Sequence, residues 1–256
     1  MGVFDVASPL FAWLDGLMSP WLPATARLVL WAVVAGVASM ALYRVTSNQA
    51  KLAAIKAEMA ALRQEIAAFD GPLSGMWKLV GRNLRLALRQ LWVTFVPAVI
   101  ASLPVIFLLV WVSNSFDAAM PAADQPVAVE AFARDGEALP PLHWQGDVRA
   151  TGEGKWTVAW PAAGARSALL DADDQVLLTL PPPAPVGLVH QRRWWNILLG
   201  NPAGYLPPGP VDAVEIDLPT RAYLPFGPGW LRGWIPLFFA VVIAVSLLLK
   251  ILWRLH

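Results

Sequence analysis

The sequence predicts a membrane α-helical protein with three transmembrane helices, a cytoplasmic helical hairpin after the first helix and an external all-β domain inserted after the second. Three observations lead to this fold class. Hydrophobic residues make up 57% of the 256 residues and charged residues only 14%, whereas about 25% of an ordinary soluble domain is charged. Three apolar stretches are each long enough to cross a bilayer. The two loops between these stretches carry net charges of opposite sign.

Composition and motifs also exclude several functional classes. The formal net charge of +1 argues against a DNA-binding protein, and the absence of cysteine excludes thiol catalysis and cysteine-ligated metals. The sequence contains no phosphate-binding loop, nucleophile elbow or zinc-protease motif. We therefore expect no enzymatic activity, no cofactor and no metal site. The histidines are too scattered for a shared metal: His143, His190 and His256.

Each predicted span has the length that a bilayer requires. About 20 apolar residues cross the hydrocarbon core, because a helix rises about 1.5 Å per residue. The first span is predicted over residues 24–43, and the second over residues 91–112, which include Pro97 and Pro104. The third span lies within residues 230–256, which end in a short cytoplasmic tail.

Loop charges predict the orientation. Residues 44–90 contain eight basic and three acidic side chains, whereas residues 113–229 contain seven basic and 13 acidic ones. Positively charged loops are retained in the cytoplasm. The first loop is therefore predicted to be cytoplasmic, and the long second segment and the N-terminus to be external. For a bacterial inner-membrane protein, the long segment would be periplasmic and the C-terminus cytoplasmic.

The cytoplasmic loop, residues 44–90, is predicted to be a helical hairpin. Its first arm carries five apolar residues at alternating spacings of three and four, typical of a short coiled coil: Leu52, Ile55, Met59, Leu62 and Ile66. An Asp-Gly-Pro turn at residues 70–72 ends this arm. The second arm carries a basic stripe on one face: Lys78, Arg82, Arg85 and Arg89. This stripe is either a solvated face or a track for anionic lipid, ribosomal RNA or a nascent chain.

The external segment predicts a β-domain over residues 113–190, because short β-rich runs at residues 127–134, 155–160 and 175–180 alternate with Pro- and Gly-rich turns. Residues 191–229 are predicted to contain an interfacial helix, a Pro- and Gly-rich return to the membrane and a candidate last strand at residues 214–218. Interfacial anchors are expected at the start of this segment: Arg192, Arg193, Trp194 and Trp195.

The N-terminal residues 1–23 have two interpretations. They form either an amphipathic helix on the outer membrane surface or a partly ordered tail. The apolar residues that favour the helix are Phe4, Leu10, Phe11, Leu14 and Leu17.

Arg27 is the basic residue inside the first apolar run. A transmembrane arginine either snorkels to the interface or faces a polar cavity. Arg27 therefore either reaches the outer interface or lines a hydrated groove that receives an incoming polar segment. Hydroxyl side chains on the spans could complete such a groove: Ser39, Thr94, Ser102 and Ser246.

The order of these parts, carried by residues 27–66, 85–112 and 224–252, resembles the Oxa/YidC insertase superfamily. The likeness is to its small branch, the archaeal YidC-like proteins and the insertase subunit of the endoplasmic-reticulum membrane protein complex. It implies a YidC-like core in which three helices form a hydrophilic groove, with Arg27 matching the arginine often found in the first core helix. The external β-domain has no counterpart in the smallest members of this branch.

By this resemblance, the protein would be a cofactor-free membrane-protein insertase or chaperone. Its partners would be membrane lipids, nascent membrane-protein clients, and a ribosome or another membrane subunit. Two other functions remain open: a non-catalytic scaffold subunit of an inner-membrane complex, or an envelope sensor or binding module that acts through the β-domain. A polar, basic cavity between the helices would favour the insertase, a dry packed bundle the scaffold, and a deep apolar pocket in the β-domain the binding module.

Overall fold

The computed structural model describes residues 2–134, 137–145 and 148–253. Within these residues, three helices are long and apolar enough to cross a membrane, as predicted: α2 (Ala24–Thr46), α4 (Leu73–Phe116) and α6 (Trp234–Leu252). The chain divides into two compact units. One unit contains Met1–Leu28 and Phe107–Phe238, and the other contains Val29–Ile106 and Phe239–His256.

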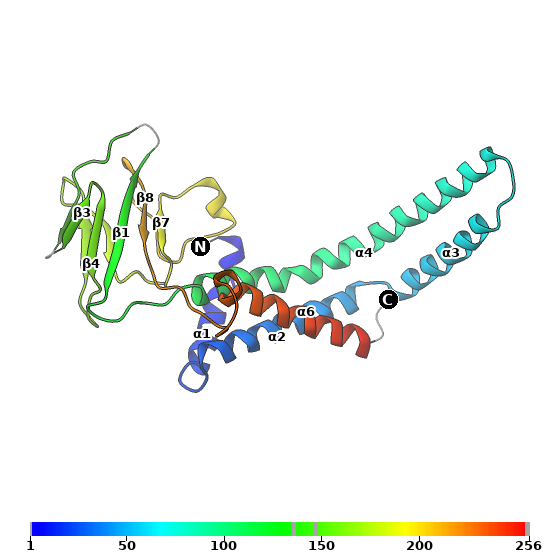
Figure 1. The fold of residues 1–256 in the computed structure, drawn as a ribbon, viewed down its shortest axis with the longest axis horizontal. Coiled ribbons are helices and arrows are strands. Elements are labelled where there is room, and N and C mark those ends of the chain that lie inside the picture. The colour runs from blue at the N-terminus through cyan, green and yellow to red at the C-terminus, as the bar shows by residue number, and fades with distance from the viewer. Residues whose placement is uncertain (1, 135–136, 146–147, 254–256) are drawn as a thin grey trace. The chain divides into compact units, whose positions relative to one another are not determined.

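Helix α4 is one uninterrupted helix of 44 residues (Figure 1). The sequence predicted a hairpin arm up to residue 90 and a separate span from residue 91. The structure has no break at this position, and one helix contains both. At 1.5 Å per residue it is about 66 Å long, roughly twice the thickness of the hydrocarbon core. Pro97 and Pro104 lie inside α4 without ending it.

The predicted hairpin is present, with α3 (Gln49–Ala67) as its first arm and the beginning of α4 as its second. The Asn48 side chain caps α3 by accepting a hydrogen bond from the Lys51 amide at 2.9 Å. The predicted apolar seam is the inward face of α3: Leu52, Ile55 and Leu62 are buried, and Met59 and Ile66 are half-buried.

The β region consists of two antiparallel sheets within the described residues. The larger has the strand order β3-β4-β1-β8-β7 (Figure 1). The smaller has the order β2-β5-β6. The larger sheet contains β1 (Pro126–Ala133), β3 (Arg149–Gly152), β4 (Lys155–Ala159), β7 (Leu188–His190) and β8 (Val211–Ile216). The smaller sheet contains β2 (His143–Gln145), β5 (Ser167–Leu170) and β6 (Val176–Leu180).

Both sheets contribute to one hydrophobic core. In β1 the buried side chains alternate at Val127, Val129 and Ala131, as expected for a strand with one covered face. Trp144 from the smaller sheet and Trp156 from the larger sheet meet edge to face, with ring centroids 6.2 Å apart. The aromatic contact joins the two sheets across the core.

The larger sheet extends beyond residue 190, into the segment where a candidate last strand was predicted. Strand β8 pairs with β1 on one side and β7 on the other, so residues up to Ile216 belong to the same sheet. The four predicted runs overlap with four strands, although β8 begins three residues before its predicted run: β1, β4, β6 and β8. The remaining strands were not predicted, because each has only three or four residues and their positions are fixed by pairing with longer strands.

Two hydrogen bonds connect the end of α4 with the chain that enters α6. The Tyr223 hydroxyl donates to the Phe116 carbonyl oxygen at 2.6 Å, and Trp234 Nε1 donates to Asp117 Oδ1 at 3.0 Å. Two short helical segments, α5 (Gly229–Arg232) and η2 (Trp194–Ile197), lie in the same unit.

The N-terminal segment is helical rather than a tail. It contains η1 (Val3–Asp5) and α1 (Ser8–Met18), with Pro9 in the first turn of α1. The predicted apolar face is divided between two environments. Phe11 packs against Trp111 with ring centroids 5.8 Å apart, whereas Leu10 and Leu17 are exposed.

Candidate functional site

Arg27 forms an ion pair with Asp15, and each side chain is 14% exposed. Arg27 lies in the first turn of α2, and Asp15 lies on α1. The Arg27 guanidinium carbon also lies 5.6 Å from the centroid of the Phe116 ring. The sequence identified Arg27 but not its acidic partner, which neutralises the charge locally.

Arg27 and Asp15 line a cavity of about 710 Å³ within the unit that contains the sheets. Its wall also includes Trp111, Asn114 and Arg221. Among the described residues, Arg27 Nε and Ser8 Oγ are buried without a hydrogen-bond partner. The cavity therefore combines charged, polar and apolar surface at the first turn of α2.

The four hydroxyl residues predicted to share a groove with Arg27 lie in the other unit. Thr94 donates to the carbonyl oxygens of Gln90 and Leu91, and Ser102 donates to that of Val99, so both bond within α4. Ser39 on α2 and Ser246 on α6 are half-buried. No described contact joins these four hydroxyls with one another.

Gly36 brings α2 and α6 close together. A Cβ atom at Gly36 would lie 3.0 Å from Val245 Cγ1 and 3.3 Å from the Val242 carbonyl oxygen. Ala32 and Ala35 on the same helix are also buried. Small residues at this spacing let membrane helices approach closely. Sequence analysis missed Gly36, although a glycine inside an apolar span is a recognisable signal.

The basic stripe on α4 is partly used in the hairpin. Arg82 pairs with two acidic residues of α3, Glu58 at 3.2 Å and Glu65 at 3.9 Å. Lys78, Arg85 and Arg89 are exposed. The stripe is therefore both a contact between the arms and a charged surface.

A second stripe on α4, which sequence analysis missed, is apolar and exposed. Its members recur at spacings of three and four residues, and each is between 42% and 76% exposed: Leu73, Trp77, Val80, Leu84, Leu88, Leu91 and Phe95. We call this set the apolar stripe. The same heptad spacing predicted the seam in α3, but the pattern in α4 was obscured by the basic residues interleaved with it. The stripe begins in the hairpin arm and continues into the predicted span.

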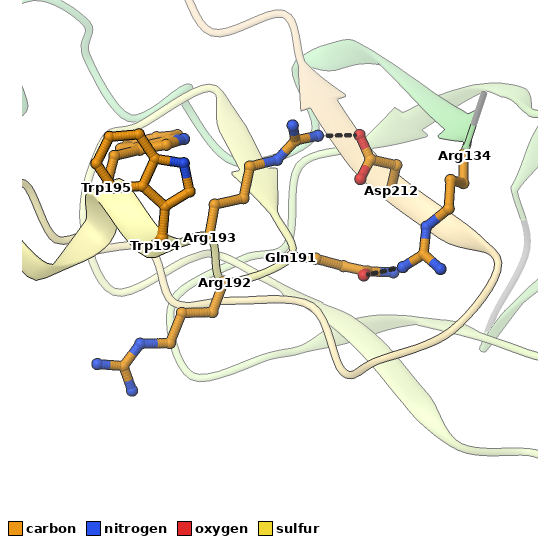
Figure 2. Close-up of a pocket in the computed structure, with 7 residues that line it drawn as sticks. All are labelled: Arg134, Gln191, Arg192, Arg193, Trp194, Trp195 and Asp212. Carbon is orange, nitrogen blue, oxygen red and sulfur yellow. Dashed lines mark hydrogen bonds and ion pairs between the residues drawn. The ribbon is translucent and has the colours of Figure 1, made fainter.

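The four predicted interfacial anchors gather around a second pocket, of about 510 Å³ (Figure 2). Arg193 Nη2 is 2.6 Å from Asp212 Oδ2 on β8. Arg134, at the end of β1, donates to Gln191 Oε1 at 2.8 Å. The predicted helix is a single 3-10 turn, η2. Arg134, Gln191 and Asp212 were not predicted, because strand pairing brings them to the pocket from distant parts of the chain.

In the part of the chain that the structure describes, no group of three His, Asp or Glu side chains could hold a metal ion. The Asp171 side chain organises a turn, because its Oδ1 accepts hydrogen bonds from the amides of Asp173 and Gln175.

In comparisons with known proteins, the chain matched no family model, no curated protein and no solved structure.

Proposed function

We propose that the protein is a cofactor-free insertase or chaperone for membrane proteins, of the Oxa/YidC kind, and that the apolar stripe of α4 receives the client. In this proposal the hairpin is cytoplasmic and the sheets lie outside the membrane. The observation that carries the proposal is the exposure of seven apolar side chains along one face of α4.

The apolar stripe has the length and chemistry that a transmembrane client requires. Between Leu73 and Phe95 it extends for about 33 Å along the helix, comparable with the hydrophobic length of a transmembrane segment. On surfaces that face water, large exposed apolar patches are uncommon unless they bind a partner. Outside the bilayer, this stripe could shield an apolar client; where it enters the span, the client could pass into lipid.

The basic stripe lies on a neighbouring face of the same helix. Lys78, Arg85 and Arg89 are exposed there and would attract anionic headgroups or acidic flanks of a client. Electrostatic attraction mainly accelerates encounter, whereas apolar contact provides the affinity. The two stripes therefore support a sequence of capture and transfer that needs no cofactor.

Site-specific photocrosslinking during synthesis of a small membrane protein tests this function. A photoreactive residue at Leu84 or Leu88 should crosslink to the nascent client. Leu86 is the matched control, because it lies on the same helix but is 5% exposed. Crosslinks to the client from positions 84 and 88 but not from 86 are expected. Absence of client crosslinks from both exposed positions would contradict the proposal.

A second candidate function, a scaffold subunit of a membrane complex, is favoured by the close packing at Gly36. That contact leaves little room for a hydrated groove between α2 and α6 at this level. A scaffold would hold a permanent partner on the apolar stripe. In the same experiment it would give crosslinks to one stable protein, whether or not a client is being synthesised.

A further inference from the structure

The connection between β7 and β8 contains an exposed tryptophan on a short 3-10 turn. Trp194 is 80% exposed and Ile197 is 62% exposed, although both belong to η2. Asn196 is 1% exposed and fixes the turn: its Oδ1 accepts from the Arg193 amide at 2.7 Å, and its Nδ2 donates to the Leu199 carbonyl at 2.9 Å. The turn presents apolar side chains to the surroundings while its polar groups are satisfied internally.

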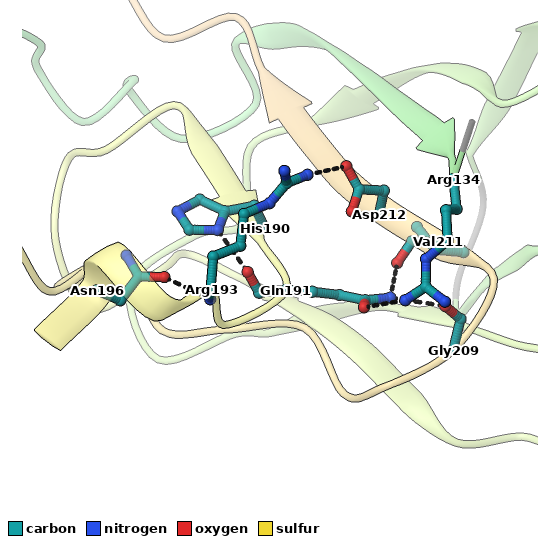
Figure 3. A network of polar contacts seen from close by, with 8 residues as sticks. All are labelled: Arg134, His190, Gln191, Arg193, Asn196, Gly209, Val211 and Asp212. Carbon is teal, nitrogen blue, oxygen red and sulfur yellow. Dashed lines mark hydrogen bonds and ion pairs between the residues drawn. The ribbon is translucent and has the colours of Figure 1, made fainter.

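A positively charged pocket adjoins this turn. It contains three arginines and one carboxylate, a formal charge of +2: Arg134, Arg192, Arg193 and Asp212. Gln191, which also lines the pocket, is fixed by its own side chain: Nε2 donates to the carbonyl oxygens of Gly209 at 2.7 Å and Val211 at 2.6 Å (Figure 3). Arg193 uses Nη2 for Asp212, and a guanidinium carries five N–H donors. The pocket therefore suits an anionic group such as a phosphate.

The N-terminal segment extends the apolar surface of the turn. The Phe4 amide donates to the Leu198 carbonyl oxygen at 3.1 Å. Asp5, which is buried, accepts hydrogen bonds through Oδ2 from the amides of Gly2 and Gly200. These bonds join the segment around residues 2–5 to the segment around residues 198–200. The first segment carries the exposed side chains of Val3 and Val6, and the second carries those of Ile197, Leu198 and Leu199. Two segments that are distant in sequence are thus held together by hydrogen bonds, and both contribute exposed apolar side chains to the surface of this region.

We propose that this surface docks on the membrane and that the arginine pocket binds the phosphate of an acidic phospholipid. Exposed tryptophan and aliphatic side chains beside arginines are the composition that a bilayer interface accommodates. The charge of the pocket complements an acidic headgroup. The chain also runs from the N-terminal segment through α1 into α2, which is the first candidate membrane span. The lipid site would fix the sheet-containing unit against the bilayer surface.

The full-length protein in nanodiscs provides the test, with phosphatidylcholine alone or mixed with phosphatidylglycerol. Because the chain has no cysteine, an environment-sensitive fluorophore can be placed at Ile197→Cys, and at Ala163→Cys as an exposed control. The probe at position 197 should enter an apolar environment, and acidic lipid should increase the shift. The control probe should stay in water with both lipids.

Native mass spectrometry then measures how many acidic lipids remain bound. The double variant Arg134→Gln/Arg192→Gln keeps the Arg193–Asp212 pair and should lower binding of phosphatidylglycerol about tenfold or more. The control Arg149→Gln/Arg166→Gln removes the same charge from exposed positions outside the pocket and should have little effect. The circular dichroism spectrum checks that both variants are folded.

Three results would overturn the lipid site. Equal phosphatidylglycerol binding by the two double variants would show that the charge effect is not specific to the pocket. Binding of inorganic phosphate, with the probe at position 197 remaining in water in acidic nanodiscs, would indicate an ion site instead. Absence of an apolar shift of that probe in both kinds of nanodisc would show that the turn does not dock on the bilayer.

Discussion

At the scale of single residues, two aspartates have roles that their sequence neighbourhood conceals. Asp5 and Asp15 interrupt the apolar pattern of the N-terminal segment. In the structure, Asp5 bonds with the amide of Gly200, and Asp15 pairs with Arg27. Neither contact can be predicted from periodicity, because each depends on which segment folds against the N-terminus.

The ion pair between Arg27 and Asp15 should be tightly coupled. Removing one partner leaves a mostly buried charge unpaired, so Arg27→Gln and Asp15→Asn should each cost stability at the lower end of roughly 3–5 kcal/mol. The double variant should lose less than the sum of the single variants. Thermal unfolding in detergent measures these effects, with the exposed Arg63→Gln as the control. Strictly additive losses would show that the two charges do not interact.

Tyr223 should make the connection between α4 and α6 sensitive to alkaline pH. Burial raises the pKa of its hydroxyl above the ordinary value of 10.0. Since the pKa is higher in the folded state, the hydroxyl contributes stability below pH 10.0, and this contribution is lost as the pH rises through the raised value. Tyr223→Phe also leaves the Phe116 carbonyl without this donor, at a cost of about 1–3 kcal/mol.

The measurement for Tyr223 is the change in Tm from about pH 9 to about pH 11. The wild-type protein should lose more stability than Tyr223→Phe over this interval, because the variant has no hydroxyl to ionise at this position. A parallel decline in both proteins would attribute the alkaline loss to other groups.

At the scale of elements, sequence periodicity predicted the helices and strands in which apolar residues recur regularly along one face. The spans, the α3 seam and the four longer strand runs belong to this class. The short strands were missed because their pairing partners lie elsewhere in the chain, and the single helix α4 was divided because its polarity changes along its length. The predicted groove also depended on how the spans pack, which hydroxyl positions in sequence do not specify.

The α3 seam should control the opening of the hairpin. Leu62 is 2% exposed on the seam, whereas its neighbour Ala61 is exposed. Leu62→Asp would bury an unpaired carboxylate and should open the arms, while Ala61→Asp adds the same charge in solvent. Limited trypsin digestion should cut Leu62→Asp several-fold faster at Lys56 and Arg63. Equal cleavage of both variants would mean that the seam does not hold the arms together.

At the scale of the whole molecule, opposite charges on the two long connections give the protein its predicted orientation. The hairpin segment is basic and the segment with the sheets is acidic, which favours retention of the first in the cytoplasm and export of the second. The proposed client-binding function requires this arrangement, because the hairpin must meet nascent clients on the side where proteins are made. The absence of cysteine makes the orientation directly measurable.

Single cysteines at Ala57 on α3 and at Ala163 in the sheet-containing unit occupy exposed positions. In intact bacterial cells whose outer membrane has been permeabilised, a membrane-impermeant maleimide should label position 163 and leave position 57 unlabelled until the inner membrane is opened. Labelling of both positions before the inner membrane is opened, or of position 57 alone, would contradict the proposed three-span orientation.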